Sequence, residues 1–159
     1  MATNHFREGT QAVTPYLNVR NAQAAIEFYQ KVFGATEVMR LVMPDGRVGH
    51  AEIKIEGSIV MLADEFPEMG LVSPLALGDR RSPVALHLYV ADVDAIYKGA
   101  LAAGAKSLRE PTDQFYGDRD GQICDPFGHV WHIATHKEDM SPAEMKRRMD
   151  QMLRQGKDQ

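Results

Sequence analysis

Short runs of alternating apolar and polar residues predict strands in both halves of the chain. In the segment 14–19 the odd-numbered positions are apolar, and in the segment 84–90 the even-numbered positions carry Val or Leu. A period of two places alternate side chains on opposite faces, so each strand buries one face only. The pattern predicts further strands at 36–43, 48–55, 58–63, 106–110, 121–125 and 129–134.

Two further segments have apolar residues three and four positions apart, which predicts an amphipathic helix in each. The first follows Asn21, a good N-cap residue, and ends at Gly34, which takes a left-handed conformation without steric cost. The second follows Asp92 and ends near Gly104. A third helix is predicted near the C-terminus, where Ser141 and Glu144 have the spacing of a capping box.

The order strand, helix and three strands therefore occurs twice, and matching residues recur at a nearly constant separation. Val19 and Gly57 correspond to Val90 and Gly128. An internal repeat of this kind predicts two similar structural units. The predicted fold class is α+β, with two βαβββ modules in tandem at 12–63 and 84–135. Their sheets are expected to form a curved, half-barrel pair around a cavity, with a helix at the C-terminus.

Three segments lie outside the modules. Residues 1–11 are an N-terminal tail, and prolines and glycines predict an irregular linker at 64–83. The linker leaves from a predicted cavity strand, so we expect it to act as a lid. Residues 136–159 form a helical tail with an apolar stripe of Met145, Met149, Met152 and Leu153. Because such a stripe needs a partner surface, we expect a homodimer.

Composition narrows the classes of partner and compartment. The chain of 159 residues has a net charge of -4, and its modules lack a basic cluster of the kind that binds nucleic acid. No apolar run is long enough to span a membrane, and the first residues are not those of a signal peptide. Cys124 is the only cysteine, which excludes an internal disulfide. These features predict a cytoplasmic protein.

Several motifs resemble those of the vicinal oxygen chelate superfamily, which includes glyoxalase I, extradiol dioxygenases and bleomycin- and fosfomycin-resistance proteins. The resemblance covers residues 12–135 and is greatest to the branch of phosphonate-operon B-like proteins. The matching residues are TPYL at 14–17, AIEFY at 25–29, FGA at 33–35, DVDA at 92–95, GA at 104–105, GDR at 117–119, DPFGH at 125–129 and Trp131. One fold hosts many functions, so the resemblance implies the fold and leaves the activity open.

Strand alternation predicts which side chains face the cavity. One face of the strands is almost wholly apolar and is expected to lie under the helices, whereas the other mixes aromatic, polar and ionisable groups, as small-molecule pockets do. On this second face His87 and His132 are candidate general bases, because a neutral imidazole accepts a proton near pH 7. Arg119 is either an anion clamp or an ion-pair partner that holds a strand turn. The candidate ligand-binding residues are Tyr16, Asn18, His50, Glu52, Met61, Tyr89 and Arg119.

The resemblance also implies where a metal ion would be bound. Metal-dependent family members take one ligand from the first and one from the last strand of each module, and these places fall on Thr14, Met61, Ala85 and His132. Of these four, His132 alone is a good ligand for a divalent metal. We therefore predict no metal and no other cofactor. The alternative is a displaced site made of His50, Glu52, His87 and His132.

Three functions are compatible with this pattern. The first is a metal-independent protein that binds a small organic molecule between the modules, which the missing ligands favour. The second is a metal-dependent enzyme of the glyoxalase or dioxygenase type with a variant ligand set. The third is a metal-free lyase or isomerase with a histidine base. In each case the tyrosines and histidines of the cavity face favour a planar, moderately polar molecule.

Overall fold

The computed structural model describes residues 10–78 and 82–155, so most of the predicted N-terminal tail lies outside the described residues. The first module contains β1 (Tyr16–Val19), α1 (Ala22–Phe33), β2 (Thr36–Val42), β3 (Val48–Ile55) and β4 (Ser58–Asp64). The second contains β5 (Ala85–Tyr89), α2 (Val93–Ala102), β6 (Lys106–Asp113), β7 (Asp118–Cys124) and β8 (Val130–His136). The predicted α+β fold with two tandem βαβββ modules is confirmed.

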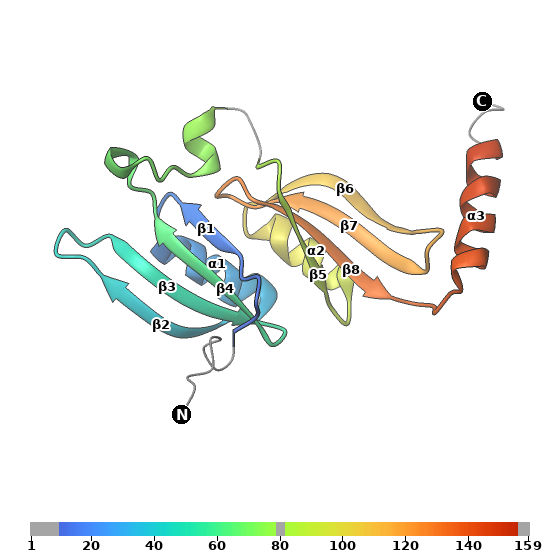
Figure 1. The fold of residues 1–159 in the computed structure, drawn as a ribbon, viewed down its shortest axis with the longest axis horizontal. Coiled ribbons are helices and arrows are strands. Elements are labelled where there is room, and N and C mark those ends of the chain that lie inside the picture. The colour runs from blue at the N-terminus through green and yellow to red at the C-terminus, as the bar shows by residue number, and fades with distance from the viewer. Residues whose placement is uncertain (1–9, 79–81, 156–159) are drawn as a thin grey trace.

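Each module forms its own four-stranded sheet, with the strand orders β1-β4-β3-β2 and β5-β8-β7-β6. β1 runs parallel to β4 and β5 runs parallel to β8, whereas the other neighbours are antiparallel. In Figure 1 the two sheets lie side by side, with α1 and α2 behind them. Neither sheet closes into a barrel within the described residues, and β1 and β5 are edge strands that border the space between the modules.

Both module helices begin at the predicted caps. The Asn21 side chain accepts a hydrogen bond from the Ala24 amide (3.1 Å), and the Asp92 side chain accepts one from the Ala95 amide (3.0 Å). Each bond satisfies an amide of the first turn that has no partner within its helix. Gly34 ends α1 with a φ of 65°, the left-handed conformation that its lack of a Cβ allows.

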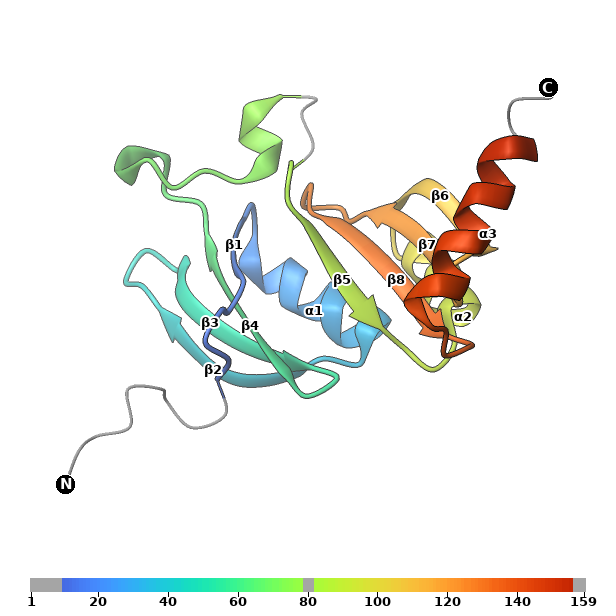
Figure 2. The ribbon, with the colours of Figure 1, turned by 45° about the vertical axis from the view of Figure 1, so that its right-hand side comes forward.

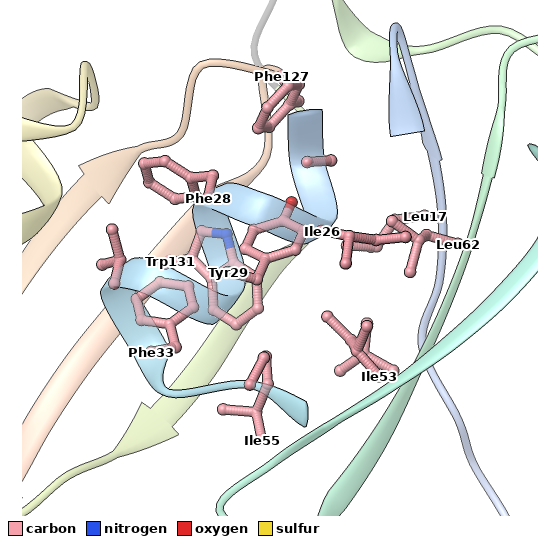
Figure 3. Packing of buried hydrophobic residues seen from close by; sticks show 14 of the residues in the cluster. Leu17, Ile26, Phe28, Tyr29, Phe33, Ile53, Ile55, Leu62, Phe127 and Trp131 are labelled. Atoms are coloured by element: carbon pink, nitrogen blue, oxygen red, sulfur yellow. The ribbon is translucent and has the colours of Figure 1, made fainter. Parts of the chain in front are cut away.

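The helices cover the apolar face of each sheet, as predicted from the alternation. The side chains of this face are buried at Leu17, Val19, Ile53, Ile55, Val60, Leu62, Leu88, Trp131 and Ile133, and partly buried at Leu86 and Val90. α1 packs against both modules, because the ring of Phe33 lies 4.7 Å from that of Trp131 between centroids. Figure 3 shows Tyr29 and Phe33 of α1 packed around Trp131. The core is therefore continuous across the two modules.

A buried carboxylate joins the modules at the same place. Asp125, in the turn between β7 and β8, accepts hydrogen bonds from the Tyr29 hydroxyl (2.7 Å) and from the Trp131 indole (2.9 Å). Its other oxygen accepts from the amides of Phe127 and His129, each at 2.9 Å. Burial, followed by the charge of Asp125, raises the pKa of Tyr29 well above its usual value, so its hydroxyl remains a donor.

The linker is held more firmly than its sequence predicts. Between β4 and β5 it forms two short 3-10 helices, η1 (Pro67–Met69) and η2 (Pro74–Leu77). Ser73 is fully buried, and its hydroxyl donates to Glu65 (2.6 Å), which also pairs with Arg20 (2.7 Å). These bonds tie Glu65 and Ser73 to Arg20, the residue after β1.

The C-terminal helix, α3 (Pro142–Gln155), stands apart from both sheets in Figure 1, and in the turned view of Figure 2 it overlaps the second module. Half of the predicted capping box is present, because Ser141 Oγ accepts from the Glu144 amide (3.2 Å). The Glu144 carboxylate pairs instead with Arg147 and Arg148. The predicted stripe of methionines and Leu153 is exposed. Within the described part of the chain, no helix has the length and apolarity needed to cross a membrane.

Candidate functional site

A cavity of about 780 Å³ lies between the inner edge strands β1 and β5, and we call it the inter-module cavity. Its apolar lining comes from the helix-covered faces of both sheets, at Leu17, Ile55, Leu86, Leu88 and Trp131. Its polar lining includes Tyr16, His87 and Tyr89, whose side chains project from the two edge strands. The tyrosine side chains stay half exposed, so a ligand can reach them from solvent.

The structure divides the predicted site residues into two groups. Tyr16, His87 and Tyr89 line the inter-module cavity. The others, which are Asn18, His50, Glu52, Met61, Arg119 and His132, are not among the residues that line it. Those on the face opposite the helices, which we call the open face, are Asn18, His50, Glu52 and Met61 of the first sheet and His132 of the second. Among the described residues of the linker, 64–78 and 82–83, only Ser82 lines the cavity.

Three predicted residues of the first sheet form a hydrogen-bonded chain that ends at the cavity. The Tyr16 hydroxyl lies 3.1 Å from His50 Nδ1, and His50 Nε2 lies 3.1 Å from Glu52 Oε1. Glu52 is buried, whereas Tyr16 reaches the cavity. Burial raises the pKa of Tyr16, which keeps the phenol protonated. With Glu52 as a carboxylate, Nε2 carries the proton and Nδ1 accepts from the phenol.

The two candidate bases of the second sheet lie next to each other on β5 and β8. Their ring centroids are 6.2 Å apart, and the ring of His87 lies 4.7 Å from that of Tyr89. Burial, followed by repulsion from His87, lowers the pKa of His132. His132 is therefore neutral at pH 7 and has a free lone pair, as a general base requires.

A polar cluster on the open face of the second sheet is missing from the sequence prediction. Asp118 accepts from the Tyr89 hydroxyl (2.9 Å) and pairs with His136 (2.7 Å), and these bonds raise the pKa of both partners. Asp120 accepts from Arg109 (2.7 Å) and from Tyr116 (3.1 Å). Both aspartates are buried. Through Tyr89 the cluster fixes one wall of the inter-module cavity.

Arg119 takes the second of its two predicted roles. It donates to both carboxylate oxygens of Asp94 on α2 (2.7 and 2.9 Å) and to Asp113 (3.2 Å). The guanidinium therefore ties α2 to β7, with both of its partners on the protein itself. A contact between Arg119 and a ligand stays a prediction from the sequence.

The residues at the family's metal positions do not fit a metal ion. Threonine, methionine and alanine side chains cannot supply the imidazole or carboxylate donors that such a site needs. The alternative set is split, with His50 and Glu52 on the first sheet and His87 and His132 on the second. In residues 10–78 and 82–155, no three His, Cys, Asp or Glu side chains come together as a metal site.

Comparisons with known proteins agree with this architecture. The model of the Glyoxalase/Bleomycin resistance protein/Dioxygenase superfamily matches residues 4–133. The uncharacterized protein Mb0911c of Mycobacterium bovis is 41% identical over 141 residues, which cover 87% of this chain and 91% of that protein. The uncharacterized protein Rv0887c of Mycobacterium tuberculosis is also 41% identical, over 87% of this chain and 82% of its own length.

Solved structures are similar in fold at lower identity. TioX from Micromonospora sp. ML1 has a TM-score of 0.59 at 22% identity, over 79% of this chain and 98% of that chain. A glyoxalase-related enzyme from Fulvimarina pelagi has a TM-score of 0.58 at 24% identity, over 79% and 88%. The fosfomycin resistance protein FosX from Listeria monocytogenes, complexed with Mn(II) and sulfate, has a TM-score of 0.60 at 14% identity, over 84% and 95%.

Proposed function

Since the chain belongs to the Glyoxalase/Bleomycin resistance protein/Dioxygenase superfamily, we propose that it binds a small organic molecule in the inter-module cavity without the metal site of its metal-dependent relatives. The cavity itself carries this proposal. Its volume of about 780 Å³ lies within the range of roughly 300–1,000 Å³ that is typical of ligand pockets. Membership of the protein in the phosphonate-operon B-like branch stays a prediction from the sequence motifs.

The lining favours a ligand that is flat and largely apolar, with a few polar groups. Leu86, Leu88 and Trp131 offer apolar surface, while Tyr16 and His87 offer hydrogen-bonding groups at the rim. Among the described residues no Lys or Arg lines the cavity, so none of these side chains supplies the cation that commonly anchors a phosphate. These features support the planar, moderately polar molecule expected from the sequence.

A fragment screen tests this proposal. We expect planar aromatic fragments such as indoles, quinolines and naphthols to raise the Tm and to change the fluorescence of Trp131, the only tryptophan and part of the lining. Tyr16→Ala and Tyr89→Ala should weaken the best fragment about fivefold or more, because each removes an aromatic contact of about 1 kcal/mol. Phe115→Ala is the control, since this aromatic residue lies outside both the lining and the cluster around Asp118 and Asp120. Equal weakening by all three variants, or by none, would place binding elsewhere.

A metal-free acid–base enzyme is the second candidate function. The hydrogen-bonded chain from Glu52 through His50 to Tyr16 favours it, because the chain places a phenol with a proton relay at the cavity. His132, with its lowered pKa, is the second candidate base. Chemical conversion of a bound compound that stops in Glu52→Gln, with binding retained, would identify this function. Unchanged compound after long incubation supports the binding protein.

We also propose that the protein is a homodimer held in part by α3. Met149, Met152 and Leu153 are exposed on a helix that stands apart from the sheets in Figure 1, and a second copy is the simplest apolar partner. Light scattering at micromolar concentration should give twice the mass of one chain. Met149→Glu with Leu153→Glu should shift the mass toward one chain, whereas Lys146→Glu on the polar side should not. A monomeric wild-type protein would contradict the proposal.

A further inference from the structure

The four edge strands of the two sheets differ in how they are protected against pairing. Natural edge strands are commonly guarded by charged residues or proline, which discourage the addition of another strand. The outer edge strands follow this rule, since β2 carries Glu37 and Arg40 and β6 carries Lys106, Glu110 and Pro111. The inner edge strands β1 and β5, with the sequences YLNV and ALHLY, contain no Lys, Arg, Asp, Glu or Pro. The unguarded edges are the two that border the inter-module cavity.

The inner edge of β5 offers a row of backbone hydrogen-bonding groups. In a parallel ladder alternate residues face the neighbouring strand, and the Val90 amide donates to the Ala134 carbonyl at the end of β8 (2.8 Å). By the same alternation Leu86 and Leu88 face β8. The amides and carbonyls of Ala85, His87 and Tyr89 therefore point toward the cavity, and no strand of the described residues pairs with them.

The inner edge of β1 is shorter and partly occupied. The carbonyls of Pro15 and Val19 accept bonds on the β4 side, so the backbone groups of Tyr16 and Asn18 point outward. The outward carbonyl of Asn18 is hydrogen-bonded to His129 Nε2 (3.1 Å). The inner edge of β5 therefore has more unpaired backbone amides and carbonyls than the inner edge of β1.

From this geometry we propose that the inter-module cavity binds a short extended peptide, whose backbone pairs as an added strand with the inner edge of β5. The inference rests on the proposed function, because it names the ligand class of the same cavity. Main-chain hydrogen bonds give affinity in this mode of recognition, and pockets for alternate side chains give selectivity.

The dimensions and lining indicate what kind of peptide fits. The five residues of β5 offer an edge of about 17 Å, at roughly 3.3 Å per residue, which suits about five residues of ligand. Alternate ligand side chains would point toward the apolar lining at Leu88 and Trp131, and the others toward His87 and Tyr89. The expected ligand therefore has apolar residues at every second position and no charge at its centre.

The test uses capped pentapeptides with apolar residues at alternate positions, screened against the full chain by Trp131 fluorescence and calorimetry. The best binder is then compared with its singly N-methylated forms, which keep every side chain but lose one backbone donor. Methylation at the alternate positions that face β5 should weaken binding about tenfold or more, because each loses a hydrogen bond and adds a clash. Methylation at the intervening positions should weaken it less than about threefold.

Two variants of the protein test the same pairing by changing the β5 edge instead of the peptide. His87→Ala removes the imidazole and keeps the amide of the β5 edge, whereas His87→Pro removes both. If both variants keep the wild-type circular dichroism, His87→Pro should bind the pentapeptide about fivefold or more weakly than His87→Ala. If His87→Pro does not fold, the comparison of the N-methylated peptides tests pairing with the β5 edge without it.

Each result has a distinct meaning for the two proposals. If planar fragments bind at the cavity and no pentapeptide does, the peptide inference is wrong while the proposed function stands. If pentapeptides bind equally well with any amide methylated, pairing with the β5 edge is likewise excluded. If neither fragments nor pentapeptides bind, both proposals fail.

Discussion

Replacing Asp125 with alanine should lower the free energy of unfolding by about 3–5 kcal/mol. This buried carboxylate accepts four hydrogen bonds, from Tyr29, Trp131 and two backbone amides. Its loss leaves several buried donors without a partner, and one of them belongs to the helix of the other module. Urea denaturation followed by far-UV circular dichroism measures the effect without depending on the fluorescence of Trp131.

Two control substitutions test whether this loss of stability is specific to Asp125. Tyr29→Phe removes a single donor and should cost only about 1–2 kcal/mol. Asp113→Ala removes a carboxylate that is 79% exposed and should cost less than about 1 kcal/mol. If Asp125→Ala costs no more than Asp113→Ala, the two modules are not joined through this residue.

Replacing Gly117 with alanine should cost about 2–4 kcal/mol. Its φ of +96° is a conformation that residues with a Cβ rarely adopt, and an added Cβ would collide with the Glu138 carbonyl oxygen. The Gly117 carbonyl also accepts the amides of Lys137 and Glu138 (2.9 and 3.0 Å). The substitution should therefore loosen the segment that leads to α3 and disturb Asp118, the next residue.

Gly99→Ala is the matched control for this glycine. Gly99 lies inside α2, and a Cβ placed there meets nothing within 4 Å. The same substitution should raise the stability by about 0.5–1 kcal/mol, because alanine is the better helix former. Thermal unfolding of both variants gives the comparison. Equal Tm values for the two would contradict the local geometry around Gly117.

The sequence is most informative where a strand has one buried face and one open face. The alternation in β1 and β5 predicts both faces correctly, because burial on one side imposes a strict period of two. The same reasoning finds Tyr16, His87 and Tyr89 at the cavity. It cannot tell that the cavity lies between the edges of the sheets, since that depends on how Phe33 packs against Trp131, far away in the sequence.

The polar cluster of the second sheet is harder to predict for a local reason. β6 and β7 pair with irregular register between Ser107 and Arg109 and again between Arg109 and Thr112, and such shifts break the period. Polar residues also occupy both faces of these strands. The sequence pattern therefore places Asp118 and Asp120 in a loop, although the structure buries both within β7. A signal was present in their spacing of two, which is that of side chains on one strand face.

The most direct test of the inter-module cavity as the ligand site is a crystal structure of the protein with the best-binding fragment. We expect ligand density between β1 and β5, in contact with Tyr16 and Tyr89 and above Leu88 and Trp131. Density confined to the open face of the second sheet, over His132 and Asp120 and with no ligand between β1 and β5, would contradict it.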